Sequence, residues 1–143
     1  MPSPSGLSSQ VGMAKESNYG VYAAPATFFP WLSDSLDIER DRIESEAVVA
    51  GRLVQTSGQW QQGNIKVGGD LGFEFYDRSA GKLLEQIFGS ASTSGSGPYT
   101  HTFRPGTLPS ATWQLGRPAN DATVYPFTVT GAKVASAEIA AKV

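Results

Sequence analysis

A long run of alternating residue types, followed directly by a helical pattern, constrains this chain more than any other feature. Along residues 65–76 (IKVGGDLGFEFY), the odd positions are mostly large and apolar, whereas the even positions are mostly small, acidic or basic. Successive side chains of a strand point to opposite faces of a sheet. The run therefore predicts one strand of roughly 40 Å, at about 3.3 Å per residue, with an apolar face and a small, acidic face.

The residues that follow predict a helix over 79–88. Leu83, Leu84, Ile87 and Phe88 form one apolar stripe at helical spacing. Ser79 or Asp77 can cap the amino end, and Gly89 ends the helix.

Composition points to one mainly β domain with many turns. The chain has 143 residues, 16 glycines and nine prolines, which favours short strands over a helical bundle. Cysteine is absent and His101 is the single histidine, which excludes disulfides, thiolate metal sites and multi-histidine zinc sites. A net charge of −2 gives no support for electrostatic binding of nucleic acid. No apolar run approaches the roughly 20 residues that span a bilayer, and the amino-terminal residues lack signal-peptide features.

Residues 1–18 are rich in Ser, Pro and Gly, and we expect a flexible amino-terminal arm there, followed by one domain over 19–143. The aromatic segment from Tyr19 to Trp31 contains Pro25 and Pro30, which exclude a helix. This segment either packs across the core of its own domain or lies against a neighbouring copy.

Shorter elements are expected along the rest of the chain. Residues 32–40 favour a strand, with a helix as the alternative, and residues 50–64 favour a long loop or a protruding hairpin that carries Trp60. Residues 90–97 (SASTSGSG) have the composition of a flexible linker. Strands are expected at YTHTFR, ATWQLGR and VYPFTVTGAKV. The closing run KVASAEIAAKV alternates to the end of the chain, and we expect either a terminal strand paired to a neighbour or a truncated longer protein.

Residues with catalytic potential do not form a recognisable constellation. His101 lies in a strand-like segment without a G-x-S-x-G motif, and VGGDLG precedes no helix that could hold a phosphate. Acidic pairs such as Glu44 and Glu46 are more often solvated charge than acid–base machinery. We therefore expect no enzyme, no cofactor and no metal site.

The acidic face of the predicted strand is smooth, because Gly68 and Gly72 lie between Asp70 and Glu74. Asp37 and Glu39 repeat the arrangement beside Ile38. Strands of this kind from several copies would form a sheet with one wet, low-relief, acidic face. The alternative is the ordinary solvent-facing side of a β-sandwich.

The order of these segments resembles the major tail tube proteins of long, non-contractile-tailed bacteriophages. The resemblance runs over residues 16–134, from ESNYGVYAAPATFFPWLSDSLDIERDRIESEAVVAGR through VGGDLGFEFYDRSAGKLLEQIFG to YTHTFRPG and YPFTVTGAKV. It implies a β-sandwich or partial barrel with one flanking helix. It also implies that six copies close into a ring, that rings stack into a hollow tube, and that strands from every copy form a continuous inner barrel through which DNA passes.

The resemblance further implies a location in the virion tail, after assembly in the host cytoplasm and without membrane involvement. Partners would be other copies of the chain and, within the tail, the tape measure, tail terminator and distal tail proteins. Acidic side chains repel the phosphates of passing DNA, whereas basic ones would bind them. The residues expected to line the lumen are Asp70, Glu74, Gly68, Gly72, Asp37 and Glu39.

The helix 79–88 is then expected to cover the outer, apolar face of the long strand. The amino-terminal arm and the loop 50–64 are expected to reach the next subunit or ring, with Trp60 as an anchor. Contacts are expected from Trp60, Gln59, Arg52, Tyr19, Tyr22, Phe28 and Phe29.

Two other classes of function are weighed against self-assembly. A β-sandwich module could bind a glycan or peptide through Trp60, Trp113 and Tyr99. A hydrolase with an unrecognised site near His101 is the third reading.

Overall fold

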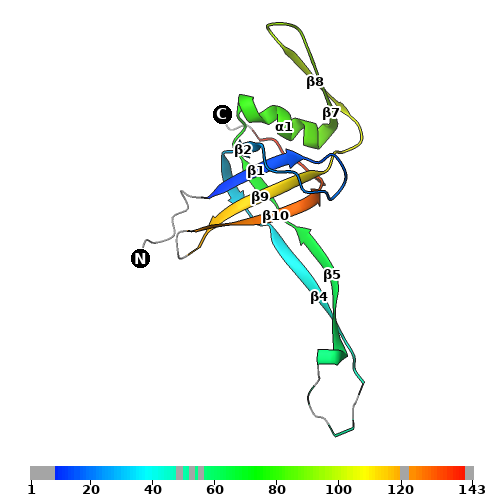
Figure 1. Cartoon of the computed structure of the whole chain (residues 1–143). Helices are drawn as coiled ribbons and strands as arrows, with labels where there is room; N and C mark the ends of the chain where they lie inside the picture. The colour runs from blue at the N-terminus through cyan, green and yellow to red at the C-terminus, as the bar shows by residue number, and fades with distance from the viewer. Residues whose placement is uncertain (1–8, 48–49, 52–53, 55–56, 120–122, 141–143) are drawn as a thin grey trace. The chain divides into compact units, whose positions relative to one another are not determined.

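The computed structural model describes residues 9–47, 50–51, 54, 57–119 and 123–140 (Figure 1). They divide into two compact units. One contains the residues up to Leu32 together with those from Phe73 onwards, and the other is Ser33–Gly72. The described chain is mainly β with a single α-helix, and its sheets are open, which confirms the predicted fold class.

The first unit is built on a four-stranded antiparallel sheet with the order β10-β9-β1-β2. Its strands are β1 (Gln10–Lys15), β2 (Thr27–Phe29), β9 (Ala111–Pro118) and β10 (Val124–Ala132). The two central strands, β1 and β9, are far apart in the sequence. They pair antiparallel with a register that runs from Gln10↔Gly116 to Lys15↔Ala111. The expectation of a flexible arm is therefore wrong for residues 10–15, where Val11 and Met13 are buried.

One face of this sheet carries the core. Val11 lies directly opposite Leu115 and Phe29, and these side chains are buried. Trp113 packs with Phe29 and Phe73 in an aromatic cluster whose ring centroids are 5.4–5.8 Å apart. Such ring pairs contribute about 0.5–1.5 kcal/mol each beyond the burial of apolar area.

The segment between β1 and β2 covers the opposite face of the sheet. A Cβ atom added at Gly12 would lie 2.9 Å from Pro25 Cβ and Phe28 Cε1, so the segment approaches the backbone of β1 closely. The Ala23 N–H donates a 3.1 Å hydrogen bond to Thr112 Oγ1 in β9. The aromatic segment therefore packs on the sheet of its own domain. This is the first of the two alternatives expected from the sequence.

Helix α1 spans Asp77–Phe88 and confirms the predicted helix, which ends at Gly89 in the left-handed conformation (φ 91°). The predicted caps are wrong, because Asp77 and Ser79 lie inside the helix and Tyr76 occupies the N-cap position without a side-chain bond. The buried helix residues are Ser79, Ala80 and Gln86. The apolar stripe is instead half-buried, and Phe88 is exposed.

Strands β7 (Gly89–Ser94) and β8 (Thr100–Pro105) form an antiparallel hairpin directly after α1 (Figure 1). The expectation of a flexible linker over 90–97 is thus wrong for residues 90–94. Two further short strands, β3 (Trp31–Asp34) and β6 (Leu71–Phe73), pair with each other. Residues 133–140 are not in a strand, contrary to the alternating pattern there.

The second unit is a β-hairpin. Strand β4 (Asp37–Glu44) pairs antiparallel with β5 (Trp60–Gly68), and a 3₁₀ turn, η2 (Ser57–Gln59), precedes β5. The predicted strand over 32–40 is therefore two strands, β3 and β4, separated by Ser35 and Leu36. Residues 50–64 are expected to form either a long loop or a protruding hairpin. The hairpin is confirmed for residues 60–64, which belong to strand β5.

The long strand predicted over 65–76 is wrong. β5 ends at Gly68, β6 contains only Leu71–Phe73, and Gly69 between them adopts a φ of 141°. A Cβ atom at Gly69 would lie 2.5 Å from the carbonyl oxygen of Ser35. α1 packs chiefly against β7, β8 and β2, so it does not serve as the expected cover of one long strand.

Candidate functional site

The β4–β5 hairpin has two chemically different faces. Residues directly opposite each other in the register share a face, and Asp37 pairs with Gly68 and Glu39 with Lys66. Alternation along β4 adds Asp41 to these residues. We call Asp37, Glu39, Asp41, Lys66 and Gly68 the acidic face, because it sets three carboxylates against one ammonium.

The other side of the hairpin carries apolar residues and one arginine over the same length. Ile38 pairs with Val67 and Arg40 with Ile65, and we call these four residues the apolar face. Ile65 is 55% exposed and Val67 is 41% exposed. Aliphatic side chains of this size are normally buried, so a face of this composition is suited to contact with another surface.

A β-bulge separates this part of the hairpin from its far end. β5 has one more residue than β4 between the pairs Arg40↔Ile65 and Arg42↔Gln62. Gly63 lies in the bulge, where an added Cβ would be 3.0 Å from Asp41 Cβ. A bulge increases the local right-handed twist, so it re-aims the side chains beyond it.

Beyond the bulge, Trp60 is held on the surface by a charged pair. The Arg42 guanidinium carbon lies 5.0 Å from the centroid of the Trp60 ring, and Arg42 Nε lies 2.7 Å from Glu44 Oε1. Trp60 is 46% exposed. An exposed cation–π contact is worth about 0.5–1 kcal/mol, enough to orient the indole without burying it.

The base of the hairpin is joined by two hydrogen bonds between Ser35 and Asp70. Ser35 N–H donates to the Asp70 carbonyl oxygen (3.0 Å), and Asp70 N–H donates to Ser35 Oγ (2.8 Å). Asp70 thus belongs to the connection after β5, outside the strand. Gly72 is half-buried within β6, and Glu74 is exposed after β6.

Of the residues expected to line a lumen, the structure therefore brings Asp37, Glu39 and Gly68 onto one face. Asp41 and Lys66 belong to the same face, although they are not among the residues expected to line the lumen. Continuation of the β4 alternation beyond residue 40 is the signal that would have revealed Asp41.

The residues expected to make intersubunit contacts fall into different surroundings. Tyr19, Tyr22 and Phe28 are exposed, whereas Phe29 is buried in the core. Gln59 Nε2 donates a 3.0 Å hydrogen bond to the Ala47 carbonyl oxygen across the end of the hairpin. Arg52 lies outside the described residues.

The β7–β8 hairpin also has two different faces, although its composition resembled that of a linker. Its register places hydroxyl side chains and Arg104 on one face: Ser90, Ser92, Ser94, Thr100, Thr102 and Arg104. Ala91, Thr93, His101 and Phe103 lie on the other. On that second face, Thr93 Oγ1 lies 2.8 Å from His101 Nδ1.

Glu16 fastens the aromatic segment to the sheet. It is 7% exposed, and its carboxylate accepts hydrogen bonds from Gly131 N–H (2.8 Å), Thr112 Oγ1 (2.9 Å) and Gly20 N–H (2.9 Å). Burial alone would raise the pKa of Glu16, but hydrogen bonds from Gly131, Ser110, Gly20 and Thr112 outweigh it and hold the pKa below its ordinary value.

One residue considered for another class of function lies in the core. Trp113 is buried in the core, which removes it from any glycan-binding or peptide-binding surface. Within the described ranges, no three side chains among His, Cys, Asp and Glu are grouped so that they could hold a metal ion. Of the helical residues described, none forms a helix long and apolar enough to cross a membrane.

Comparison with protein families matches residues 6–143 to the phage tail tube protein family. No curated protein matches the chain. The match covers nearly the whole sequence and agrees with the mainly β fold and its single described helix. The chain therefore belongs to the phage tail tube protein family and is a structural component of the virion tail.

Proposed function

We propose that six copies of this chain close into a ring, and that stacked rings form the hollow tube through which phage DNA passes. The observation that carries the proposal is the β4–β5 hairpin, whose two strands pair with no further strand among the described residues. A two-stranded hairpin is at best marginally stable alone in water, and unpaired edges invite pairing with another chain. Pairing between copies would satisfy these edges, and the exposed Ile65 and Val67 would then lie on one face of a larger sheet.

If hairpins of several copies form the tube, the acidic face indicates which side of the sheet faces the lumen. DNA that slides through a tube must not adhere to it, and carboxylates repel phosphates, whereas clustered cations would bind them with release of counterions. We therefore assign Asp37, Glu39 and Gly68 to the lumen, together with Asp41. Asp70, Gly72 and Glu74, which follow β5 in the chain, complete the proposed lining.

Exposed aromatic side chains supply the proposed contacts between copies. Trp60 is oriented by Arg42, and an exposed tryptophan of this kind is a typical anchor residue of protein interfaces. Tyr19, Tyr22 and Phe28 remain exposed although their segment packs on the sheet. These residues are available to an adjacent subunit or to the next ring.

Within the virion, the tube would contact the tape measure protein inside it, and the tail terminator and distal tail proteins at its ends. DNA would pass without sequence-specific contacts. Assembly would take place in the host cytoplasm before the tail joins the particle.

Assembly is tested by size-exclusion chromatography and negative-stain microscopy of the concentrated protein. Rings or tubes with a central channel are expected. A protein that stays monomeric at high concentration, in the presence and absence of the tape measure protein, would contradict the proposal.

The lumen assignment is tested by charge reversal. Asp37→Lys with Glu39→Lys should yield tubes that retain DNA at low salt, because the acidic face becomes basic. Glu46→Lys with Glu138→Lys makes the same change in net charge at two exposed residues outside the strands. Equal DNA retention by the two double variants would refute the assignment of Asp37 and Glu39 to the lumen.

A further inference from the structure

The apolar face of the β4–β5 hairpin contains one charged side chain, Arg40. Arg40 is exposed, lies directly opposite Ile65, and forms no ion pair among the described residues. A surface that covers the aliphatic side chains of this face would also bury the guanidinium, and a buried charge is costly unless it is paired and hydrogen-bonded. The surface that fits this face must therefore be apolar and must carry a carboxylate.

Few carboxylates of the chain meet this description. The exposed carboxylates that lie outside the acidic face and form no ion pair among the described residues are Glu46, Asp70, Glu74, Asp77 and Glu138. Asp70 and Glu74 are assigned above to the lumen lining, and the residues adjacent to Glu46 are small. Asp77, which follows Phe75 and Tyr76, and Glu138, which precedes Ile139, remain as candidates.

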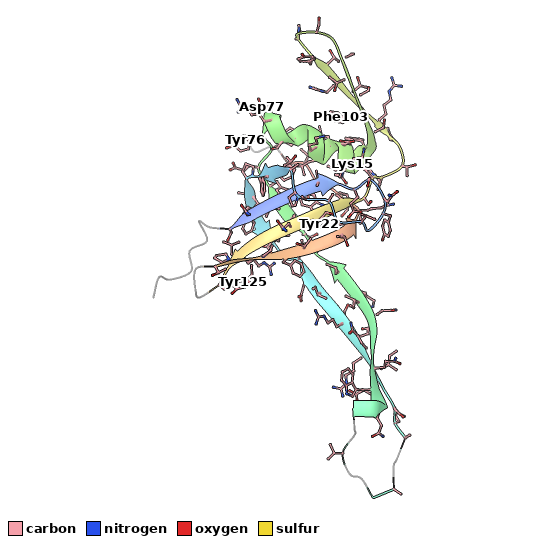
Figure 2. All side chains as sticks on the ribbon, viewed as in Figure 1. Lys15, Tyr22, Tyr76, Asp77, Phe103 and Tyr125 are labelled. Atoms are coloured by element: carbon pink, nitrogen blue, oxygen red, sulfur yellow. The ribbon has the colours of Figure 1, made fainter. Side chains whose placement is uncertain are left out.

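Asp77 lies at the amino end of α1, beside two exposed aromatic side chains. Phe75 is 60% exposed and Tyr76 is 50% exposed. The Tyr76 carbonyl oxygen accepts the Ala80 N–H (2.8 Å), which holds this segment to the first turn of the helix. Figure 2 shows Tyr76 and Asp77 together at one end of α1. We call Phe75, Tyr76 and Asp77 the helix-entry segment.

The helix-entry segment complements the apolar face in composition and charge. Two aromatic rings can cover aliphatic side chains, and arginine both pairs with carboxylates and stacks on aromatic faces. Asp77 Oδ1 accepts the Arg78 N–H (2.7 Å), which leaves Oδ2 for another donor. Glu138, in contrast, has a single large apolar neighbour, Ile139, and lies outside the helix and strands. The helix-entry segment is therefore the better match.

We propose that the helix-entry segment of one copy docks on the apolar face of the β4–β5 hairpin of a neighbouring copy, where Asp77 pairs with Arg40. This inference rests on the tube proposed above and identifies what covers the side of the wall that faces away from the lumen. Because the acidic and apolar faces are opposite sides of the same two strands, the docked segment lies outside the channel and does not meet the DNA.

Exchange of the two charges tests the pair. Arg40→Asp opposes two carboxylates and Asp77→Arg opposes two guanidinium groups, so each change should raise the protein concentration needed for tube formation at least roughly tenfold. The variant with both changes regains opposite charges and should return to within about threefold of the unmodified chain. Sedimentation measures the concentration of unassembled protein, and circular dichroism of each unassembled variant controls for folding.

The matched control is Arg40→Asp with Glu138→Arg, which has the same net charge as the exchanged pair. This control should remain impaired, because Glu138 is not the partner of Arg40. Equal recovery with Asp77→Arg and with Glu138→Arg, no recovery with Asp77→Arg, or no effect of either single change would overturn the pairing.

Cross-linking tests the docking without reversed charges, and the chain has no cysteine of its own to interfere. One protein carries Val67→Cys and a differently tagged protein carries Tyr76→Cys. The two are co-assembled with unmodified chain and treated with a short bismaleimide. A tagged heterodimer is expected in tubes and not in unassembled protein. Lys66→Cys is the matched control for Val67→Cys, because it is the neighbouring residue and lies on the opposite face.

A heterodimer that forms equally with Lys66→Cys, or no heterodimer in well-formed tubes, would overturn the docking. Failure of the unmodified chain to form tubes would instead refute the proposed function itself.

Discussion

Glu16 is the residue whose replacement should reveal most about how the first unit is held together. Its carboxylate joins three segments that are distant in sequence: the turn at Gly20, the start of β9 at Thr112, and the end of β10 at Gly131. Thr112 Oγ1 donates to this carboxylate while accepting the Ala23 N–H. The aromatic segment is therefore connected to the sheet through a chain of hydrogen bonds that begins at one buried charge.

The perturbation is Glu16→Gln, which preserves the shape of the side chain and removes its charge. The amide oxygen can replace Oε1 and keep the bonds from Gly131 and Thr112, but the amide NH₂ then faces the Gly20 N–H, which loses its acceptor. A hydrogen bond to a charged group contributes about 1.5–3 kcal/mol, and an orphaned buried donor costs about 1–3 kcal/mol. We expect the free energy of unfolding to fall by roughly 2–4 kcal/mol.

The assay is urea unfolding at pH 7, monitored by tryptophan fluorescence, to which the buried Trp113 contributes, under conditions where the chain is monomeric. With a slope of about 2 kcal/mol per molar urea, the midpoint should fall by roughly 1–2 M. Glu138→Gln removes a charge from an exposed side chain and should leave the midpoint unchanged. Equal midpoints for the Glu16 and Glu138 variants would refute the role of this carboxylate.

The pH dependence provides a second check with a definite sign. Because the pKa of Glu16 is lowered in the folded state, its contribution is fully present above the unfolded pKa, near 4.5, and is lost as pH falls through the lower folded pKa. The difference in stability between the unmodified chain and Glu16→Gln should therefore be largest above pH 4.5 and shrink below it. A difference that grows on acidification would contradict the reasoning.

Three further substitutions test other features. Gln86→Met should raise the free energy of unfolding by about 1–2 kcal/mol in urea titrations, because both amide atoms of the buried Gln86 lack hydrogen-bond partners; a loss of stability would show that the amide is satisfied. Gly69→Ala should speed hydrogen exchange of the β4 and β5 amides, since the left-handed backbone and the contact with Ser35 cost about 1–3 kcal/mol; unchanged exchange would refute this. Gly12→Ala should displace Pro25 from the sheet and increase proteolysis of residues 19–26, and an unchanged cleavage rate would count against close packing there.

Features determined by nearby residues could be predicted from the sequence. The helix was found because its apolar spacing and Gly89 lie within a few turns of each other. The end of β5 was missed, because the alternating pattern continues through Gly69 and only the contact with Ser35, far away in the chain, requires a turn there. The small residues at 68 and 69 fitted a smooth strand equally well.

Strands β1 and β7 show why non-local pairing limits such predictions. The sequence QVGMAK has weak strand character, yet β9 and β2 enclose it and bury Val11 and Met13. The sequence GSASTS resembles a linker until THTFRP pairs with it residue by residue. For the candidate site, alternation alone identified Asp37 and Glu39, whereas grouping them with Gly68 and Lys66 required the register of β4 with β5.

In the proposed tube, the charges that repel DNA have a second consequence for assembly. A hairpin with free edges and exposed Ile65 and Val67 is at risk of pairing indiscriminately with other copies, and charged side chains are a common protection against such pairing. All three carboxylates of the acidic face lie on β4, whereas β5 carries Lys66, so this face disfavours pairing between the β4 edges of two copies but not between a β4 edge and a β5 edge. The same three carboxylates would thus disfavour one incorrect pairing during assembly and keep the finished channel free of bound DNA.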